Sequence, residues 1–190
     1  LWDAAGAKNL FHDPADALGM SAMYRHYVAG LLRCLPEILP FFAPTVNSYK
    51  RLVDGFWAPT KATWGVDNRT VAFRHINGGP KATRMESRIP GSDVNPYLAM
   101  AATIGAGLYG IENKLALTDQ PITGSAYHAQ MERLPRDLHE ATERLKSSTI
   151  AREIFGGDFV DHFVQTRAWE WRQFQTAVTD WELQRYFEIV

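Results

Sequence analysis

The 190-residue chain has a single cysteine, Cys34, so it cannot form a disulfide within itself, as is typical of proteins in a reducing cytoplasm. No apolar run reaches the ~18 residues that a membrane-spanning helix needs. The formal net charge is only −1, whereas nucleic-acid and membrane binders usually carry an excess of basic residues. We therefore predict a cytoplasmic protein with no membrane segment and no nucleic-acid partner.

Several familiar catalytic patterns are also missing. The six histidines lack the spacing of a zinc site. Cys34 lies in an amphipathic helical stretch, where we expect its thiol to be inert. Gly78-Gly79-Pro80-Lys81 lacks the spacing of a Walker phosphate loop and is more typical of a hairpin turn. The sequence thus gives no support to zinc, thiol or P-loop chemistry.

What the chain does have is positive charge concentrated between residues 47 and 96, with eight Lys or Arg against four Asp or Glu. Five of these cations are arginines: Arg51, Arg69, Arg74, Arg84 and Arg88. Such a cluster is costly to bring together unless it faces something anionic. We expect polyphosphate, or a metal together with its anions.

Local patterns predict helices around a few antiparallel strands. Ser21 can cap a helix to about Leu35, where Pro36 interferes, and Asn95-Pro96 is a strong helix start. The helix after Pro96 is almost uncharged until Glu112, so we expect it to be buried in the middle of the domain. Three strands are expected at residues 60–64, 70–74 and 83–89.

The remaining segments are expected to be simpler. Residues 47–51 look like a polar loop. The final sixty residues look helical, and their aromatic residues are more typical of a core or a subunit contact than of a ligand platform.

Arg84, Glu86 and Arg88 form the sharpest local pattern. Residues two apart share one face of a strand, so these three side chains form a row, and Arg74 can lie beside it. Met85 and Ile89 on the other face indicate the core side. The row is either an exposed ladder of ion pairs or part of a site, and Glu86 is either a counter-ion or a Mg²⁺ ligand.

Read together, these strings resemble the C-terminal part of the glutamine synthetase catalytic domain. The matching strings are NSYKRL (47–52), DGFWAP (54–59), WGVDNRTVAFR (64–74), PKATRMESR (80–88), NPYLAMAA (95–102) and GIENKL (110–115). They follow the family's order at near-family spacing. The resemblance implies an α+β fold in which a curved antiparallel sheet carries the site and packs on helices.

The resemblance also implies an activity and residue roles. The family uses ATP and Mg²⁺ (or Mn²⁺) to convert glutamate to γ-glutamyl phosphate, which an amine then attacks. Matched positions assign the glutamate carboxylates to Arg51 and Arg88 and the ATP phosphates to Arg74 and Arg84. Arg69 would lie near the transferred phosphoryl group. Arg69 and Arg51 are thus the candidate catalytic residues, and Glu86 is the candidate metal ligand.

One departure concerns the flap at residues 54–59. Glutamine synthetases carry there a glutamate that accepts a proton from ammonium, and the aligned residue is Trp57. An indole offers an apolar or π surface rather than a negative charge. The chain therefore resembles the γ-glutamylpolyamine synthetases and related γ-glutamylamide ligases more closely.

A second departure concerns extent. The family's remaining metal ligands and its N-terminal domain would lie upstream of Leu1. We expect residues 1–190 to be the C-terminal portion of a longer catalytic domain, inactive alone, from a protein that assembles as a homo-oligomeric double ring. A true glutamine synthetase and a non-catalytic structural relative stay open as alternatives.

Overall fold

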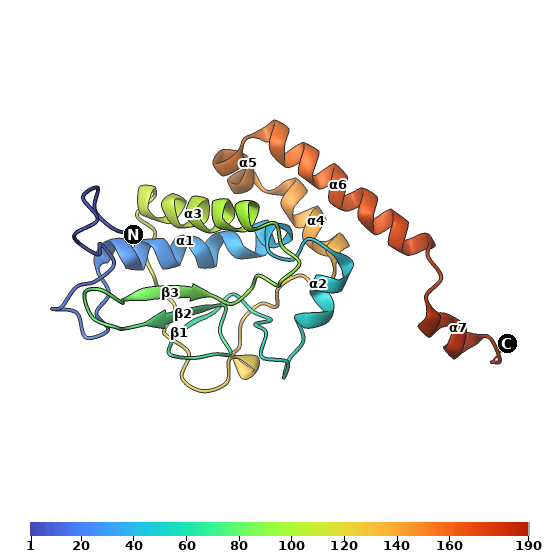
Figure 1. Cartoon of the computed structure of the whole chain (residues 1–190), viewed down its shortest axis with the longest axis horizontal. Helices are drawn as coiled ribbons and strands as arrows, with labels where there is room; N and C mark the ends of the chain where they lie inside the picture. Colours follow the sequence, from blue (N-terminus) through green and yellow to red (C-terminus); the bar gives the residue numbers. More distant parts are fainter. Residues whose placement is uncertain (190) are drawn as a thin grey trace.

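A computed structural model describes residues 1–189 and confirms an α+β fold, with a small sheet packed on helices (Figure 1). The elements are α1 (Ala22–Ile38), a 3-10 turn (Leu39–Phe41), α2 (Val46–Arg51), β1 (Trp64–Val66), β2 (Phe73–Ile76), β3 (Arg84–Ser87), α3 (Pro96–Glu112), a second 3-10 turn (Ala126–His128), α4 (Leu138–Ser147), α5 (Thr149–Phe155), α6 (Gly157–Thr176) and α7 (Asp180–Tyr186).

The sheet has the order β1-β2-β3 and is mixed rather than wholly antiparallel. β2 and β3 form the expected antiparallel hairpin, and its turn includes Gly79, which has a φ of 74°. β1 instead runs parallel to β2. The prediction of an antiparallel sheet was wrong for this pair. Residues 67–72 bring the chain back to the end at which β1 began, so β2 runs in the same direction as β1.

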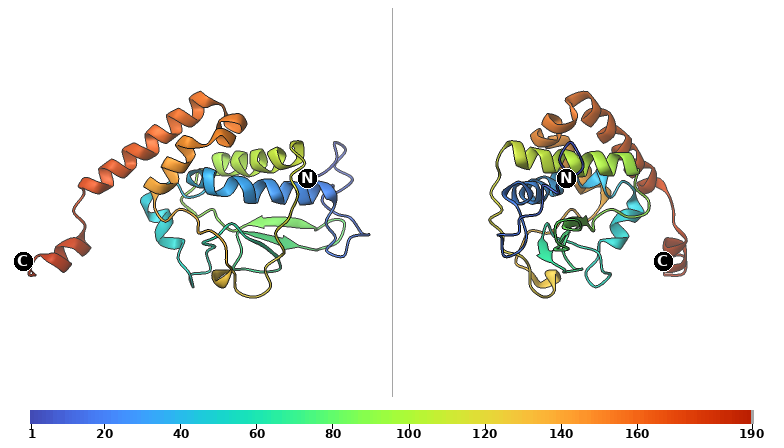
Figure 2. Two further views of the ribbon diagram at one scale, coloured as in Figure 1. Left: turned by 180° about the vertical axis from the view of Figure 1, so that it is seen from behind. Right: turned by 60° about the vertical axis from the view of Figure 1, so that its left-hand side comes forward.

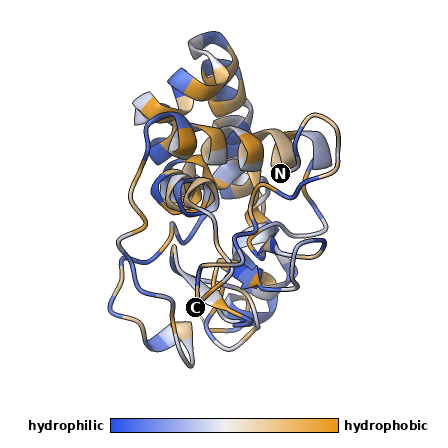
Figure 3. Ribbon diagram, turned by 90° about the vertical axis from the view of Figure 1, so that its left-hand side faces the viewer, coloured by the Kyte–Doolittle hydropathy of each residue, from blue (hydrophilic) through white to orange (hydrophobic). Residues whose placement is uncertain are grey.

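α1 and α3 lie side by side over one face of the sheet, as both views show (Figure 2). Glycine permits this close approach. A Cβ added to Gly110 would lie 2.2 Å from the carbonyl oxygen of His26 and 2.6 Å from the Cα of Gly30. The two helix backbones therefore touch, and Figure 3 shows hydrophobic residues concentrated in this helical layer.

α3 begins as predicted: the Asn95 side chain accepts hydrogen bonds from the backbone N–H groups of Tyr97 and Leu98. Its expected burial on all sides was wrong. Ala99, Ala102, Ala106 and two glycines face the interior. The opposite face exposes a stripe of four large apolar side chains: Tyr97, Met100, Ile104 and Leu108. The apolar composition of a helix indicates that it avoids water. It does not reveal which faces of the helix are packed against the rest of this chain.

α1 begins at the predicted cap, where Ser21 accepts a hydrogen bond from the Tyr24 backbone N–H. It continues through Pro36 to Ile38, beyond the predicted end. Proline removes one helical hydrogen bond, but Leu35, Ile38 and Leu39 are at most 1% exposed and hold the last turn in the core. Cys34 is also buried, which raises the pKa of its thiol to about 12 and keeps it protonated and unreactive.

The C-terminal residues are helical, as predicted, but they form separate helices. α7 extends away from the rest of the molecule and has no buried residue (Figures 1 and 2). Trp169, Trp181 and Tyr186 are exposed, and Phe187 is 82% exposed. These aromatic residues are therefore not part of the core. Among residues 1–189, the helices are all too short or too polar to cross a membrane.

Candidate functional site

The β2–β3 hairpin separates a core face from a polar face. Its register places Arg74 opposite Glu86, while the neighbouring Phe73 and His75 point into the core and are 1% exposed. Alternation along the strand produces this division. The prediction that Arg74 lies beside the Arg84–Glu86–Arg88 row is confirmed.

Glu86 lies between two guanidinium groups. Its Oε2 is 3.1 Å from Arg74 Nη1, and its Oε1 is 2.5 Å from Arg88 Nη1. Arg74 also pairs with Asp67 at 2.9 Å. Partial burial acts to raise the pKa of Glu86, but the hydrogen bonds and charges of Arg88 and Arg74 outweigh it and hold that pKa below its usual range. Glu86 is therefore ionised at neutral pH.

These side chains line a pocket of about 430 Å³ together with the flap and the segment after β1. Its lining residues are Trp57, Arg69, Arg74, Glu86 and Arg88. Three arginines against one carboxylate leave the pocket with an excess of positive charge, which suits an anion. The structure thus brings together five residues that the sequence proposed for one site. We call this hollow the arginine pocket.

Two predicted site residues lie outside that lining. Arg84 is exposed, and its Nη1 donates to the Ala82 carbonyl oxygen at 3.0 Å. Arg51 ends α2 and donates through Nη2 to the Ile89 carbonyl oxygen. Burial lowers the pKa of Arg51, and Asp93 acts against that shift. Neither arginine lines the arginine pocket, although Arg84 shares the Glu86 face of β3.

The predicted loop at residues 47–51 is instead helix α2. Thr45 and Ser48 form a reciprocal capping box, in which each side chain bonds to the backbone N–H of the other residue. Asp93 accepts from both hydroxyls, at 2.9 Å from Thr45 and 2.6 Å from Ser48. The Thr-x-x-Ser spacing was visible in the sequence, but the partner 45 residues away was not.

The flap carries backbone strain at its aromatic residue. Trp57 has a φ of 57°, a left-handed conformation that bulky residues rarely adopt, and its side chain is 66% exposed. Arg88 Nη2 donates to the Trp57 carbonyl oxygen at 3.2 Å. Asp54, earlier in the flap, accepts from Thr60 Oγ1 at 2.6 Å. Arg88 thus connects Glu86 to the flap.

Two acidic residues near the arginines were not singled out by the sequence reasoning. Asp67 pairs with Arg74, and Asp93 lies close to Arg51. Asp67 was quoted in the WGVDNRT string but was given no role. Its position two residues before Arg69 was the available signal that it lies near the site.

The residues present fit a divalent cation only in part. Within residues 1–189 there is no group of three or more His, Cys, Asp or Glu side chains that could hold a metal. Glu86 supplies one carboxylate and is surrounded by guanidinium groups. A bare cation is disfavoured there, whereas a cation that arrives with phosphate oxygens is compatible with the surrounding charge.

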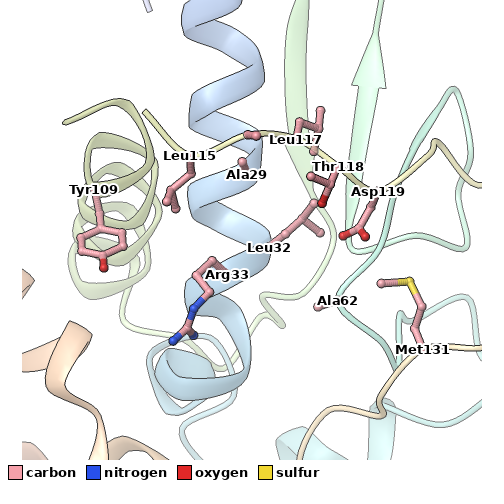
Figure 4. A pocket seen from close by; sticks show the side chains of 11 residues that line it. Ala29, Leu32, Arg33, Ala62, Tyr109, Leu115, Leu117, Thr118, Asp119 and Met131 are labelled. Carbon is pink, nitrogen blue, oxygen red and sulfur yellow. The ribbon is translucent and has the colours of Figure 1, made fainter. Parts of the chain in front are cut away.

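A different hollow, of about 350 Å³, lies between α1, the segment after α3 and Met131 (Figure 4). Arg33 and Asp119 are its charged residues. It contains none of the predicted site residues, so it is separate from the arginine pocket.

Residues 1–186 match the family model described as glutamine synthetase, catalytic domain. The chain belongs to the glutamine synthetase catalytic-domain family. This confirms the resemblance that the sequence strings suggested. In this family fold, the β2–β3 hairpin, the segment after β1 and the flap together form the arginine pocket.

Curated relatives include both glutamine synthetases and ligases for organic amines. The type-1 glutamine synthetase 2 of Dictyostelium discoideum is 60% identical over 187 residues, covering 96% of this chain and 36% of the relative. The γ-glutamylethanolamide synthetase GlnA4 of Streptomyces coelicolor is 47% identical, covering 92% of this chain and 37% of the relative. The glutamate–isopropylamine ligase of a Pseudomonas species is 42% identical, covering 100% and 42%.

A solved structure of similar fold is a GmaS/ADP complex, with a TM-score of 0.84 and 32% sequence identity. The match covers 98% of this chain and 44% of that one. The chain therefore spans less than half the length of the relatives that it matches. The three curated relatives are carbon–nitrogen ligases by their names.

Proposed function

We propose that this protein takes part in ATP-dependent ligation of the γ-carboxylate of glutamate to a polyamine or another alkylamine. Glutamate and ATP would first form γ-glutamyl phosphate and ADP. The amine nitrogen would then form the C–N bond, the C–O bond to phosphate would break, and the amine proton would leave with the phosphate. The single observation that carries the proposal is the arginine pocket with an aromatic flap residue, Trp57, in its lining.

The charges of the pocket suit phosphoryl transfer. Such reactions develop negative charge on loosely bound phosphoryl oxygens, and fixed cations stabilise it. Arg69 and Arg74 are proposed to contact phosphoryl oxygens, joined at the hairpin edge by Arg84. Arg88 and Arg51 are proposed to hold the carboxylates of glutamate, because a guanidinium binds a carboxylate bidentately.

Glu86 is proposed as one ligand of the Mg²⁺ or Mn²⁺ ion that accompanies ATP. When bound, the ion would neutralise part of the charge of the phosphates. Glu86 is ionised and keeps acceptor capacity on both oxygens, since each accepts one hydrogen bond in the structure. The other ligands are proposed to come from substrate and from residues outside this chain.

Exposed apolar surface supports assembly of identical subunits. The α3 stripe of Tyr97, Met100, Ile104 and Leu108 is exposed, as are the aromatic residues of α7. Contiguous apolar surface of this kind commonly marks a protein contact. We propose that the protein is a homo-oligomer, with the double ring of the family as the expected form, and light scattering of the purified protein tests it.

The alternative is a glutamine synthetase that uses ammonium. It is favoured by the name of the Dictyostelium relative, which is 60% identical. Against it stands Trp57, because an indole can contact a cation through its π face but cannot accept the proton that ammonium must lose.

ADP release tests these alternatives. The full-length protein is assayed with glutamate, ATP and Mg²⁺, using ammonium, ethanolamine, putrescine or spermidine as acceptor. We expect an organic amine to be preferred. Ammonium preference would select the glutamine synthetase alternative, and silence with every amine would favour a non-catalytic relative.

Trp57→Glu is the sharpest variant for this assay. It should shift preference toward ammonium by about tenfold, because a carboxylate at this position can hold a cation and accept its proton. Phe56→Glu is the matched control, since Phe56 is an exposed flap neighbour that does not line the pocket. An amine profile that stays the same in Trp57→Glu would contradict the role of Trp57.

A further inference from the structure

A second hollow adjoins the arginine pocket and has no role so far. It is a groove of about 620 Å³ between the segment after β1 and residues 121–124. Trp57 and Arg69 line both the groove and the arginine pocket. A molecule whose reacting end lies in the arginine pocket can therefore extend into the groove past the indole.

The walls of the groove are mainly apolar. They include Leu18, Val66, Pro121 and Ile122. The charged lining residues are Arg69 and Asp67, and the Asp67 carboxylate is already paired with Arg74 at 2.9 Å. The groove thus offers contact to hydrocarbon, and its single carboxylate is partly neutralised by the Arg74 guanidinium.

The two sides of the groove are fixed to each other. Asn68 Nδ2 donates to the carbonyl oxygens of Ile122, at 3.0 Å, and Gly124, at 2.7 Å. The backbone N–H of Ile122 donates to the Trp64 carbonyl oxygen at 2.9 Å, which attaches the same segment to β1. A groove held at both sides in this way is preformed and need not be organised by its ligand.

We propose that this groove holds the organic tail of the amine acceptor and selects a monoamine with an uncharged tail over a diamine or polyamine. The inference rests on the proposed function and narrows its substrate class. Apolar walls stabilise a hydrocarbon tail by removing it from water. A second ammonium group in the same place would lose hydration, would lie near Arg69 and would have to share the Asp67 carboxylate with Arg74.

Butylamine and putrescine are the matched pair of substrates, because they have the same carbon chain and differ by the terminal amino group. In the full-length protein, ADP release with glutamate, ATP and Mg²⁺ should give a kcat/KM for butylamine about tenfold or more above that for putrescine. This comparison needs no variant, so it does not depend on a substitution being tolerated.

Two variants place a carboxylate in the groove: Val66→Glu and Ile122→Glu. Each should lower the ratio of butylamine to putrescine by about tenfold, because the apolar contact is lost and a partner for the terminal ammonium is gained. Turnover with ammonium, which has no tail, is measured alongside, and a loss there as large as the loss with butylamine would overturn the groove assignment. Val178→Glu is the matched control, since Val178 is an exposed valine outside the groove.

The outcomes separate the two levels of the proposal. A wild-type preference for putrescine or spermidine would overturn the groove assignment and leave the ligase function standing. A ratio that neither groove variant moves, with near-ultraviolet circular dichroism unchanged, would overturn it as well. Absence of ADP release with every amine would instead refute the proposed function, and the groove assignment with it.

Discussion

The two faces of the β2–β3 hairpin are built from alternate residues of the same strands but have opposite physical characters. The inner face carries Phe73 and His75, each 1% exposed and packed under the helices. The outer face carries Arg74 and Glu86, which are half-buried and paired across the strands at 3.1 Å. The pleat of the strands thus separates the residues that stabilise the fold from those proposed for chemistry, so a single substitution can disturb one set and spare the other.

The largest effect is expected on the inner face. Phe73→Ala should lower the free energy of unfolding by about 3–5 kcal/mol, because it removes a fully buried ring and leaves a cavity. Urea unfolding followed by circular dichroism measures this change. The folded fraction should keep its ranking of amine substrates, and an altered ranking would show that the two faces are not independent.

The second-largest effect is expected on the outer face of the hairpin. Glu86→Gln should reduce ADP release about 100-fold or more, since the negative charge between Arg74 and Arg88 is lost. The free energy of unfolding should change by no more than about 1 kcal/mol, because the ion pairs are partly exposed to water.

Glu143→Gln is the control for that variant. It removes an exposed ion pair with Lys146, of 3.7 Å, that lies outside the arginine pocket. Activity should be unaffected there. If Glu86→Gln unfolded the protein instead of inactivating it, the division between the faces would be refuted.

A smaller effect is expected at Asp93, which lies beyond the end of β3. Asp93 accepts hydrogen bonds from Thr45 and Ser48 at the start of α2, the helix that ends at Arg51. Asp93→Asn should raise the KM for glutamate about tenfold with a smaller change in kcat, because it loosens the position of Arg51. A fall in kcat at constant KM, measured in the same assay, would argue against a positioning role.

The smallest effect concerns pH. Burial lowers the pKa of His75 in the folded protein, partly opposed by its contact with the Leu18 carbonyl oxygen. The unfolded chain therefore binds a proton near pH 6.5 that the folded protein does not, so stability should fall as pH drops below that value. The contribution of one proton is at most about 1.4 kcal/mol per pH unit.

Urea unfolding at pH 7.5, 6.5 and 5.5 measures the slope. His75→Gln should reduce it, whatever the absolute stability of that variant. An unchanged slope would mean that another group titrates in this range.

Some of this architecture could be predicted from local sequence. Ser21 and Asn95 predict the starts of α1 and α3, because a capping side chain accepts a hydrogen bond from a backbone N–H group no more than three residues away. Alternation along a strand is also local, and it predicts that Arg74 can lie beside the row that contains Glu86. The same reasoning failed for the exposed stripe of α3, since which face is covered depends on residues far away in the sequence.

The site was likewise predictable only in part. The grouping of Trp57 with Arg69 and Arg88 followed from the family resemblance, and the structure brings these residues into one pocket. The left-handed backbone at Trp57 and the hydrogen bonds from Thr45 and Ser48 to Asp93 had no signature in the local pattern. Such features arise from tertiary contacts, which a single sequence does not display.

The register of the β2–β3 hairpin makes the number of residues between the two strands important for the site. Because successive strand residues face opposite sides, removing one residue between β2 and β3 would shift their pairing and turn Glu86 away from Arg74. The hairpin turn at residues 78–81 touches no part of the arginine pocket. Substitutions in this turn should therefore leave the pocket intact where the backbone permits them, whereas a change in the number of turn residues should disrupt it.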